Sequence, residues 1–481
     1  MTGRKLDLVK CAVKFVIQNL GASDRLSIVT FSTTARSLFP LKRMFVEGRE
    51  SATLAVESLT AVGGTDIAKG LITGTRVLEG RKERDPVASI MLLSDGQDNY
   101  CHKPSQMLNK LPTPVCSSDT QHEIPVHTFG FGNDHDANIM HAISDASGGT
   151  FSYTESVGMI QDSFALCIGG LLSVVAQELR LTVRSASSGV KIVSIPSGRH
   201  VGQISDEGRQ GVVDVGNMYA EEEKQFLVYL LVPQSSALET KTSLLDVSCV
   251  YRDLASNIML QVSGERIEIL TPEICSPAEK TVSLEVDRQR NRVLVAEAIG
   301  EAKGLAEMGN MEGAREILTQ QRETLLTTPA AQAGDGLSSL LETELREIMI
   351  RMSTKESYAH TGHAFALAGM SSHLQQRATA RGDTDTSCLS AGFGASRAFG
   401  CASAFGGSSA FGFSSGGSAA FGAAGSLYSA GPTFGASAAA AGGGGLRGAP
   451  MMFGAPVGAY ETPAMLRMVE KSKNIGLQPE Q

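Results

Sequence analysis

The sequence has no tryptophan, few aromatic residues and no excess of basic charge. Aromatic residues make up 5% of its 481 positions, and 42 Lys and Arg stand against 50 Asp and Glu, giving a net charge of −8. A nucleic-acid partner is therefore not favoured, because proteins that bind phosphate backbones present clustered basic charge. The longest apolar run, residues 164–176, is shorter than the roughly 20 residues of a membrane-spanning helix. We expect no membrane span and no signal peptide.

Paired cysteines are also missing. The chain has eight cysteines, and no two of them form a C-x-x-C pair. This spacing excludes a zinc finger or a RING within these residues. Cys11, in a helical pattern, and Cys249, in a strand-like run, are interpreted as reduced thiols in the core. We therefore expect a cytoplasmic protein.

Catalytic motifs are absent as well. Ser94-Asp95-Gly96 lacks the G-x-S-x-G that surrounds a nucleophile elbow, and no P-loop or G-x-G-x-x-G lies at a strand–helix junction. His135 and His141 are six positions apart, which does not fit a pair of metal ligands one turn apart on a helix. The sequence therefore predicts a protein that is not an enzyme and needs no cofactor.

Alternating helix and strand patterns are present in residues 1–172. Apolar residues recur at three- and four-residue spacing over 2–20, which predicts an amphipathic helix. Short, nearly continuous apolar runs at 25–32, 87–94 and 125–132 are typical of parallel strands covered on both faces. This order predicts a doubly wound α/β domain.

The remaining chain divides by composition. Residues 173–275 contain strand-like runs and predict a β-sandwich-like module, and residues 276–375 predict a helical region. Residues 376–459, rich in Gly, Ala, Ser and Phe, predict a disordered low-complexity insert. Its seven Phe-Gly pairs superficially resemble nucleoporin repeats, but we interpret the insert as a linker. Residues 460–475 predict a terminal helix that belongs to the helical region.

Three stretches carry a resemblance to a known family. They are residues 14–44, residues 63–100 with GGTDI and LLSDG, and residues 286–318 together with 460–472. In combination they resemble plant von Willebrand factor A domain proteins, many of which are RING-type ubiquitin ligases of the wavy-growth group. The third stretch looks like the intein-like helical region found with these A domains. In the family, a RING precedes the A domain, and a strand ending in Asp-x-Ser-x-Ser precedes its first helix; neither pattern is present in this sequence.

The resemblance implies a reduced metal site. The family binds Mg²⁺ with hydroxyls and carboxylates from three loops, and only Thr65 (hydroxyl) and Asp95 (carboxylate) match those positions. Asp66 and Asp98 lie nearby in sequence. Because Mg²⁺ prefers octahedral oxygen ligands, this residual pair predicts weak Mg²⁺ binding at most. The alternative is that Thr65 caps its helix and Asp95 ends a strand in a turn.

The resemblance also implies an N-terminally truncated A domain without its central first strand, which would leave two neighbouring strands with unpaired backbone groups. Three explanations are open: a start assigned to an internal methionine, a truncated product, or another segment in the gap. We expect a non-catalytic protein–protein interaction protein with a degraded metal site. The alternative is the substrate-binding portion of a RING-type ubiquitin ligase whose N-terminus is absent from this chain, with ubiquitination substrates as partners.

Overall fold

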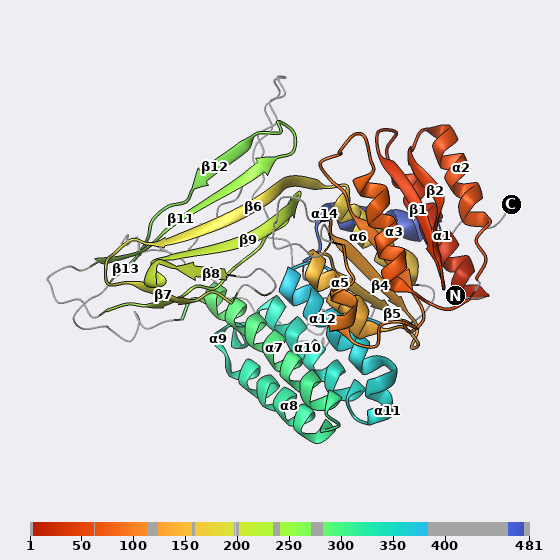
Figure 1. Ribbon diagram of the computed structural model, residues 1–481. Coiled ribbons are helices and arrows are strands. Elements are labelled where there is room, and N and C mark those ends of the chain that lie inside the picture. Colours follow the sequence, from red (N-terminus) through yellow and green to blue (C-terminus); the bar gives the residue numbers. More distant parts are fainter. Residues whose placement is uncertain are drawn as a thin grey trace, which may run out of the picture.

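Three parts of the chain meet at one junction: an N-terminal α/β domain, an elongated β module and a bundle of helices (Figure 1). None of the described helices is long and apolar enough to span a membrane. The computed structural model describes residues 3–475 apart from 62, 113–114, 116–123, 156–158, 197, 199–201, 234–240, 271–281 and 383–459.

The N-terminal domain alternates helices and strands, as predicted. Its helices are α1 (Arg4–Asn19), α2 (Val46–Glu57), α3 (Ile67–Glu79), α4 (Pro104–Leu108), α5 (Ala137–Ser147) and α6 (Ile160–Leu171). Its strands are β1 (Arg25–Phe31), β2 (Ala35–Arg43), β3 (Ile90–Ser94), β4 (Val126–Phe131) and β5 (Phe151–Thr154). The apolar face predicted for the first helix is turned inward, since Val9, Val16 and Leu20 are buried.

The sheet of this domain is interrupted. Strands β3, β4 and β5 form a parallel three-stranded sheet, whereas β1 pairs with β2 in a separate antiparallel sheet. Every residue of β4 is buried, as expected for a covered parallel strand. The same prediction for residues 25–32 is wrong, because all seven residues of β1 are only half-buried and its described ladder is antiparallel.

Helices cover both faces of the interrupted sheet. On one face α6 packs Phe164 against Phe129 of β4, with ring centroids 4.6 Å apart, and α1 lies beside α6. On the other face α3 and α5 place Leu71 and Ile139 against Leu92 of β3. The two apolar layers confirm the predicted doubly wound α/β architecture.

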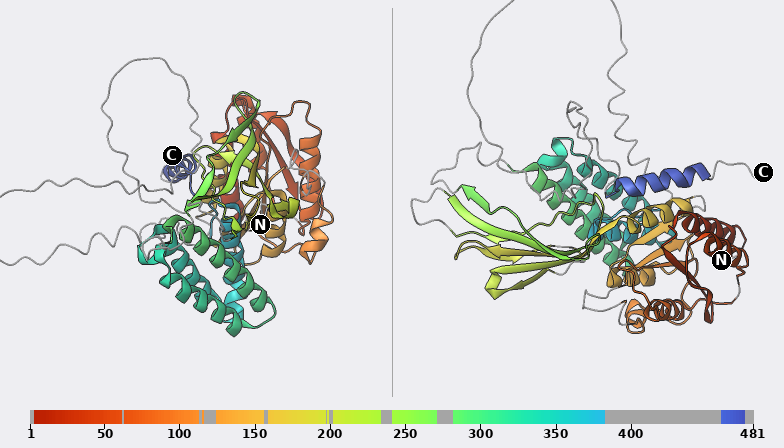
Figure 2. Two further views of the ribbon diagram at one scale, coloured as in Figure 1. Left: turned by 90° about the vertical axis from the view of Figure 1, so that its left-hand side faces the viewer. Right: turned by 90° about the horizontal axis from the view of Figure 1, so that it is seen from above.

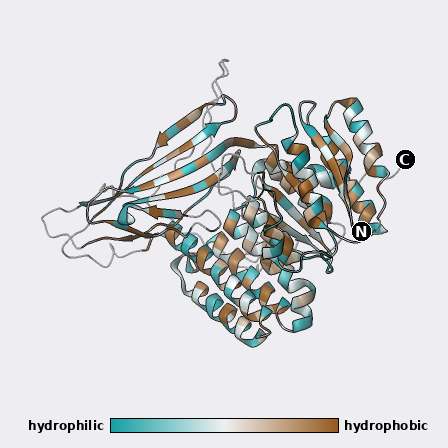
Figure 3. Ribbon diagram, viewed as in Figure 1, coloured by the Kyte–Doolittle hydropathy of each residue, from teal (hydrophilic) through white to brown (hydrophobic). Residues whose placement is uncertain are grey.

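The β module follows α6 directly and forms the predicted sandwich. Its strands are β6 (Val174–Ser185), β7 (Lys191–Ser194), β8 (Gly202–Ser205), β9 (Gln210–Tyr219), β10 (Tyr229–Leu231), β11 (Lys241–Asp253), β12 (Met259–Ser263) and β13 (Ile267–Leu270). One sheet has the order β12-β11-β6-β9-β8, with β13 also paired to β11, and β7 and β10 form the other. Polar and apolar residues alternate along the long strands (Figure 3), and Val183, Ile192 and Val213 share one core.

The two cysteine predictions have different outcomes. Cys249 of β11 is buried, as expected, but Cys11 of α1 is exposed. The prediction of a core thiol is therefore wrong for Cys11, which lies off the apolar face of its helix between Lys10 and Lys14.

The helical bundle packs directly against the N-terminal domain. Its helices are α7 (Leu284–Glu307), α8 (Met311–Thr327), α9 (Pro329–Gln332), α10 (Gly336–Arg351), α11 (Lys355–Ser357) and α12 (His363–Gln375), with a π-helical turn at Tyr358–Gly362. Ile299 and Leu345 share a core with Met140 of α5 and with Phe151 and Tyr153 of β5. The bundle and the sheet are therefore held together by one continuous apolar cluster.

Residues 376–382, which we call the strap, lie along β5. Tyr153 N donates to Ala380 O at 2.9 Å, and Gly382 N donates to Tyr153 O at 2.8 Å. Arg377 and Thr379 are buried. The predicted insert at 376–459 therefore begins too early, and its remainder, with the Phe-Gly pairs, lies outside the described residues.

The terminal helix α14 (Pro463–Ile475) packs on α6 (Figure 2). Gln161 Nε2 donates to Ser472 O at 3.0 Å, the Ser472 hydroxyl bonds the Asp162 carboxylate, and Met465 is buried beside Leu166. Its main packing partner is thus α6, a helix of the N-terminal domain.

Replacing Gly169 with alanine is expected to detach α14. A Cβ at Gly169 would lie 2.8 Å from Met465 Cα, which is backbone and cannot move aside alone. We expect a loss of about 1–3 kcal/mol of stability and faster proteolysis of α14. Gly304→Ala on α7 is the matched control, since nothing lies within 4 Å of its Cβ position, and it should stabilise slightly. Equal protection of α14 in both variants would contradict this packing.

Candidate functional site

Three loops meet at the carboxyl ends of β1 and β3. Asp66 N donates to Ser32 O at 2.9 Å, which ties the loop before α3 to the end of β1. Thr65 N donates to Asn99 Oδ1 at 2.5 Å, and Asn99 N donates to Thr65 O at 2.9 Å. This reciprocal pair fixes the loop before α3 against the loop after β3, so residues 32–34, 63–66 and 95–99 form one surface, which we call the loop edge.

Asp98 holds the loop edge together from inside. Its carboxylate is buried and accepts from Ile67 N at 2.8 Å, from Tyr100 N at 2.8 Å and from Cys101 N at 2.6 Å. These amides come from two loops that are far apart in sequence. Asp98 therefore acts as a structural anchor, and its oxygens are occupied by the backbone.

Asp66 and Lys69 form a second fixed pair. Asp66 caps α3 by accepting from Lys69 N at 3.0 Å, and its other oxygen lies 3.0 Å from Lys69 Nζ. Lys69 Nζ also donates to Thr33 O at 3.0 Å and lies 5.0 Å from the centre of the Tyr100 ring. The pKa of Lys69 is raised, first by its hydrogen bond to Asp66. The helix cap is thus Asp66, so the alternative that Thr65 caps this helix is wrong.

The structure brings the two predicted site residues to the same surface. Both Thr65 and Asp95 are half-buried, and Asp95 directly follows the last residue of β3. A Cβ built on Gly96 would lie 3.2 Å from Thr65 Oγ1, which places the threonine hydroxyl against the loop of Asp95. Both residues are thus half-buried parts of the loop edge, beside the Asp98 anchor.

The oxygen donors at the loop edge do not by themselves fit Mg²⁺. Among the residues that the structure describes, no group of three or more His, Cys, Asp or Glu could hold a metal ion. Asp66 and Asp98 accept hydrogen bonds from backbone amides, and Asp66 also pairs with Lys69. Thr65 and Asp95 together supply one hydroxyl and one carboxylate, whereas Mg²⁺ prefers six oxygen ligands.

Comparison with known proteins identifies the domain that carries this edge. Residues 1–165 match the von Willebrand factor type A domain family. The chain contains a von Willebrand factor A domain. Residues 335–474 match the VWA / Hh protein intein-like family. A von Willebrand factor type A structure from Catenulispora acidiphila shares the fold, with a TM-score of 0.57 and 18% identity over 72% of this chain and 78% of that one.

Among curated relatives, the chain is similar to plant ubiquitin ligases. It is 33% identical to the E3 ubiquitin-protein ligase WAV3 of Arabidopsis thaliana over 73% of this chain and 44% of that protein. It is 32% identical to the probable E3 ubiquitin-protein ligase WAVH2 of the same plant, over 72% of this chain and 45% of that protein. The chain thus spans less than half the length of these relatives. The predicted similarity to the wavy-growth ligases is confirmed.

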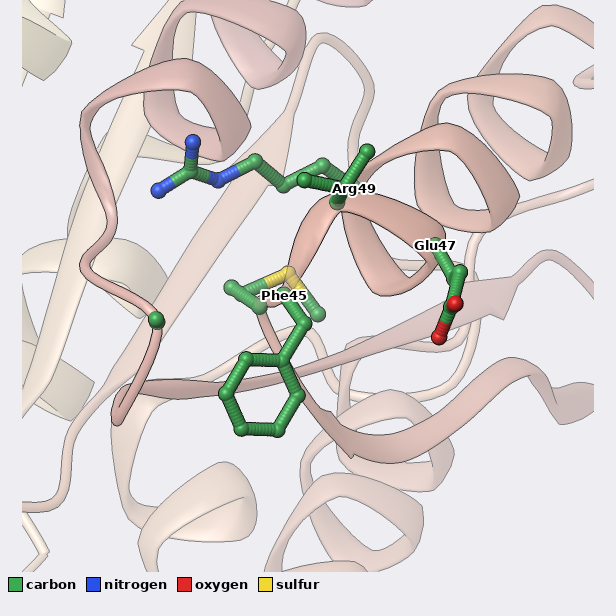
Figure 4. A pocket seen from close by; sticks show the side chains of 6 residues that line it. Phe45, Glu47 and Arg49 are labelled. Atoms are coloured by element: carbon green, nitrogen blue, oxygen red, sulfur yellow. The ribbon is translucent and has the colours of Figure 1, made fainter.

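A shallow pocket lies at the opposite end of β1 from the loop edge of the A domain. Its volume is about 380 Å³, and Phe45, Glu47 and Arg49 line it (Figure 4) together with Ala22, Met44 and Val46. Phe45 is 52% exposed. The sticks show Glu47 pointing away from Phe45 and Arg49, so no set of polar groups converges there, and the pocket is not part of the candidate site.

Sequence reasoning missed Asn99 and Lys69. Both act through contacts between loops that are more than 30 positions apart, such as Asn99 Oδ1 to Thr65 N and Lys69 Nζ to Thr33 O. A local motif carries no signal for such contacts. The Asp-x-Tyr-Cys order that begins at Asp98 did not reveal the anchoring role of this residue either, because that role depends on the amide of Ile67.

Asp98→Ala is expected to destabilise the A domain, whereas Asp134→Ala is not. Removing the Asp98 carboxylate leaves three amides without their acceptor, which we expect to reduce the free energy of unfolding by about 3 kcal/mol. Asp134→Ala, at a side chain that is 83% exposed, should change it by less than about 1 kcal/mol. Chemical unfolding of both variants tests the difference, and equal losses would refute the division into anchor and surface residue.

Proposed function

We propose that this chain is a non-catalytic protein-interaction protein whose A domain binds a protein partner through the loop edge. The observation that carries the proposal is the separation of roles there. Asp98, Asp66 and Asn99 fix the loops by hydrogen bonds to the backbone, and Thr65 and Asp95 lie half-buried at the same edge. Surface groups on preorganised loops bind with a small loss of conformational entropy.

A weakened metal site is the second element of the proposal. The donors Thr65 and Asp95 suit a hard cation but are too few to hold it tightly without a further ligand. A carboxylate from the partner would supply that ligand. Calorimetric titration of the chain with Mg²⁺ is expected to give an affinity no tighter than about 1 mM. Tighter binding that Asp95→Asn abolishes would contradict the degraded site.

The test of the interaction uses matched variants. Proteins bound by the full chain are compared quantitatively with those bound by a Thr65→Val, Asp95→Asn double variant and by Asp246→Asn, which removes a carboxylate from the distant β module. We expect the double variant to bind at least one partner about tenfold more weakly, which corresponds to a loss of roughly 1.4 kcal/mol. Asp246→Asn should leave the binding of that partner unchanged. If every partner responds equally to both variants, the loop edge is not the binding surface.

The second candidate is the substrate-binding portion of a RING-type ubiquitin ligase. The similarity to WAV3 over 73% of this chain favours it, and the chain then binds ubiquitination substrates. Free thiols at Cys101 and Cys249 support the cytoplasmic location that is part of either proposal. With ubiquitin, E1 and E2 added, the 481-residue chain alone should form no ubiquitin conjugates. Conjugation by this chain would overturn the non-catalytic proposal.

A further inference from the structure

One margin of the β module is a long strand edge that pairs with no other described strand. Strands β12 and β13 both pair with β11 on the side away from β6, so they form one interrupted edge strand over residues 259–270. Within the described residues, neither of them pairs with a strand other than β11. In Figure 1, β12 lies at the margin of the β module that is turned away from the helical bundle. Such an edge is a template for pairing with another chain.

Apolar side chains are exposed along this edge. Their exposed fractions are 45% for Met259, 38% for Leu260, 39% for Ile267 and 59% for Leu270. Natural edge strands are often kept from pairing by lysine or proline, and residues 259–270 contain neither. The edge therefore lacks two common protections against the addition of a further strand.

The amides of β12 alternate between β11 and the open side. Gly264 N donates to Val247 O of β11 at 2.8 Å. Because successive amides of a strand point to opposite edges, Val262 N also points to β11, whereas Gln261 N and Ser263 N point away from it. Two amides of β12 are thus directed at the open side.

The edge has the same pattern of polarity when its sequence is read in either direction. Residues 259–270 are Met-Leu-Gln-Val-Ser-Gly-Glu-Arg-Ile-Glu-Ile-Leu. When two copies lie antiparallel with Gly264 of each opposite Glu265 of the other, every apolar side chain is opposite an apolar one. The apolar pairs are Met259 with Leu270, Leu260 with Ile269 and Val262 with Ile267, and the polar pairs are Gln261 with Glu268 and Ser263 with Arg266. No two like charges are opposite each other, which would destabilise the pairing.

The two members of each pair also lie on the same face of the sheet, as direct opposition in an antiparallel ladder requires. Val262 is opposite the buried Cys249, and Ile267 is opposite the buried Leu245, so both point to the core side. An extra residue in the stretch 264–266 makes this possible, because strict alternation would place Val262 and Ile267 on opposite faces. The outer pairs follow by alternation along each strand.

Neighbouring registers break this pattern. A shift of one residue would place Val262 opposite Arg266 or opposite Glu268 of the other copy. It would also place side chains of different faces opposite each other. The pattern therefore specifies one register and one occupant, a second copy of the same edge.

We propose that residues 259–270 pair antiparallel with the same residues of a second copy of the chain, about a two-fold axis between Gly264 and Glu265. The sheets that contain β12 in the two copies then become one continuous sheet. The contact is isologous, because both copies use the same surface, and it closes after two copies. A dimer carries two loop edges, which strengthens binding to a partner that offers two sites. The pairing itself does not depend on the function proposed for the loop edge.

Sedimentation of the full chain at concentrations from about 1 µM to about 100 µM tests the pairing, together with hydrogen exchange at single amides. The average mass should rise toward twice that of one chain. Exchange of the Gln261 and Ser263 amides should slow at least about tenfold over this range, whereas Val262 and Gly264 should be protected throughout. A chain that stays monomeric, or a dimer in which Gln261 and Ser263 exchange as fast as in the monomer, would overturn the proposal.

Two variants separate this edge from other surfaces. Gln261→Pro removes an amide on the open side and should weaken the dimer at least about tenfold, whereas Gln261→Ala should not. Leu270→Glu places a carboxylate opposite Met259 of the other copy and should also weaken it, and its control is Val193→Glu, at a position of β7 that is 62% exposed. If the Gly264 amide loses protection in Gln261→Pro, Leu270→Glu decides. Dimers of Leu270→Glu that are as tight as those of Val193→Glu would show that another surface forms the contact.

Discussion

Lowering the pH from 7 to 5 is expected to destabilise the A domain by about 4 kcal/mol, because two of its buried histidines stay neutral while it is folded. Burial lowers the pKa of His127 to about 3 and that of His135 to about 4. A domain of this size is stable by roughly 5–15 kcal/mol. The expected loss is therefore a large part of its total stability.

The geometry explains why these rings resist a proton. His127 lies in the buried strand β4, where its Nδ1 accepts from Thr150 N at 3.2 Å. His135 donates from Nδ1 to Gly132 O at 2.7 Å and lies so close to Gly130 that a Cβ there would approach its Cδ2 to 2.3 Å. Among the described residues, neither ring is hydrogen-bonded to a carboxylate, and the Asp134 charge raises the pKa of His135 by less than burial lowers it.

The sign of the effect follows from proton uptake. Both pKa values are lower in the folded state than the ~6.5 of an unfolded histidine, so below pH 6.5 the unfolded chain binds two more protons. Stability should be constant above pH 7 and fall by about 2.7 kcal/mol per pH unit between pH 6 and 5. His141, His363 and His373 are shifted in the same direction, whereas burial raises the pKa of Asp136 and acts in the opposite direction. Urea unfolding at half-unit pH steps measures this slope.

A non-titrating variant isolates one of the two protons. His127→Gln is expected to be less stable at pH 7 but to reduce the slope by about 1.4 kcal/mol per pH unit. Carboxylates such as Glu344, whose pKa is lowered to about 2, contribute only below pH 4.5 and do not affect this window. A slope that is unchanged in His127→Gln would show that this ring is charged in the folded protein.

The sequence predicted local elements better than it predicted pairing. Amphipathic spacing located α1, and continuous apolar runs located β3 and β4, since these patterns depend on near neighbours. Strands β8 and β12 were not located individually from the sequence, because they are only four and five residues long and mostly exposed. The partner of β1 could not be predicted from its own residues, because an apolar run is the same whether one or both of its edges are paired.

Residues of the candidate site could be predicted only where they belong to a short sequence motif. Thr65 and Asp95 were found through GGTDI and LLSDG, but the roles of Asp98 and Asn99 depend on amides that the fold brings together. The strap shows the same limit: no local pattern marks it as ordered, yet Arg377 is buried because it forms an ion pair with Glu222 of a distant turn. Long-range ion pairs leave no periodic trace in a sequence.

Replacing Arg377 with alanine is expected to lower the free energy of unfolding by about 3–5 kcal/mol. Arg377 Nε lies 2.8 Å from Glu222 Oε1, and its Nη2 donates to Asn217 O at 2.7 Å. Its guanidinium carbon lies 4.0 Å from the centre of the Tyr219 ring. All of these groups are at the junction where β9 ends beside the strap. Without the arginine, Lys224, at 3.3 Å, is the charged partner that the buried Glu222 carboxylate keeps among the residues that the structure describes.

Urea unfolding at pH 7 tests this loss, and an exposed pair supplies the control. Arg266 Nε lies 2.7 Å from Asp246 Oδ1 on the surface of the β module, so Arg266→Ala should change stability by less than about 1 kcal/mol. The loss of stability in Arg377→Lys should lie between those of Arg377→Ala and Arg266→Ala, because lysine keeps the charge but not the paired hydrogen bonds or the ring contact. Equal effects of Arg377→Ala and Arg266→Ala would show that the strap is not held by this ion pair. A larger loss for Arg377→Ala, with earlier exchange of the Tyr153 amide that bonds Ala380, would show that the same arginine also holds the strap against β5.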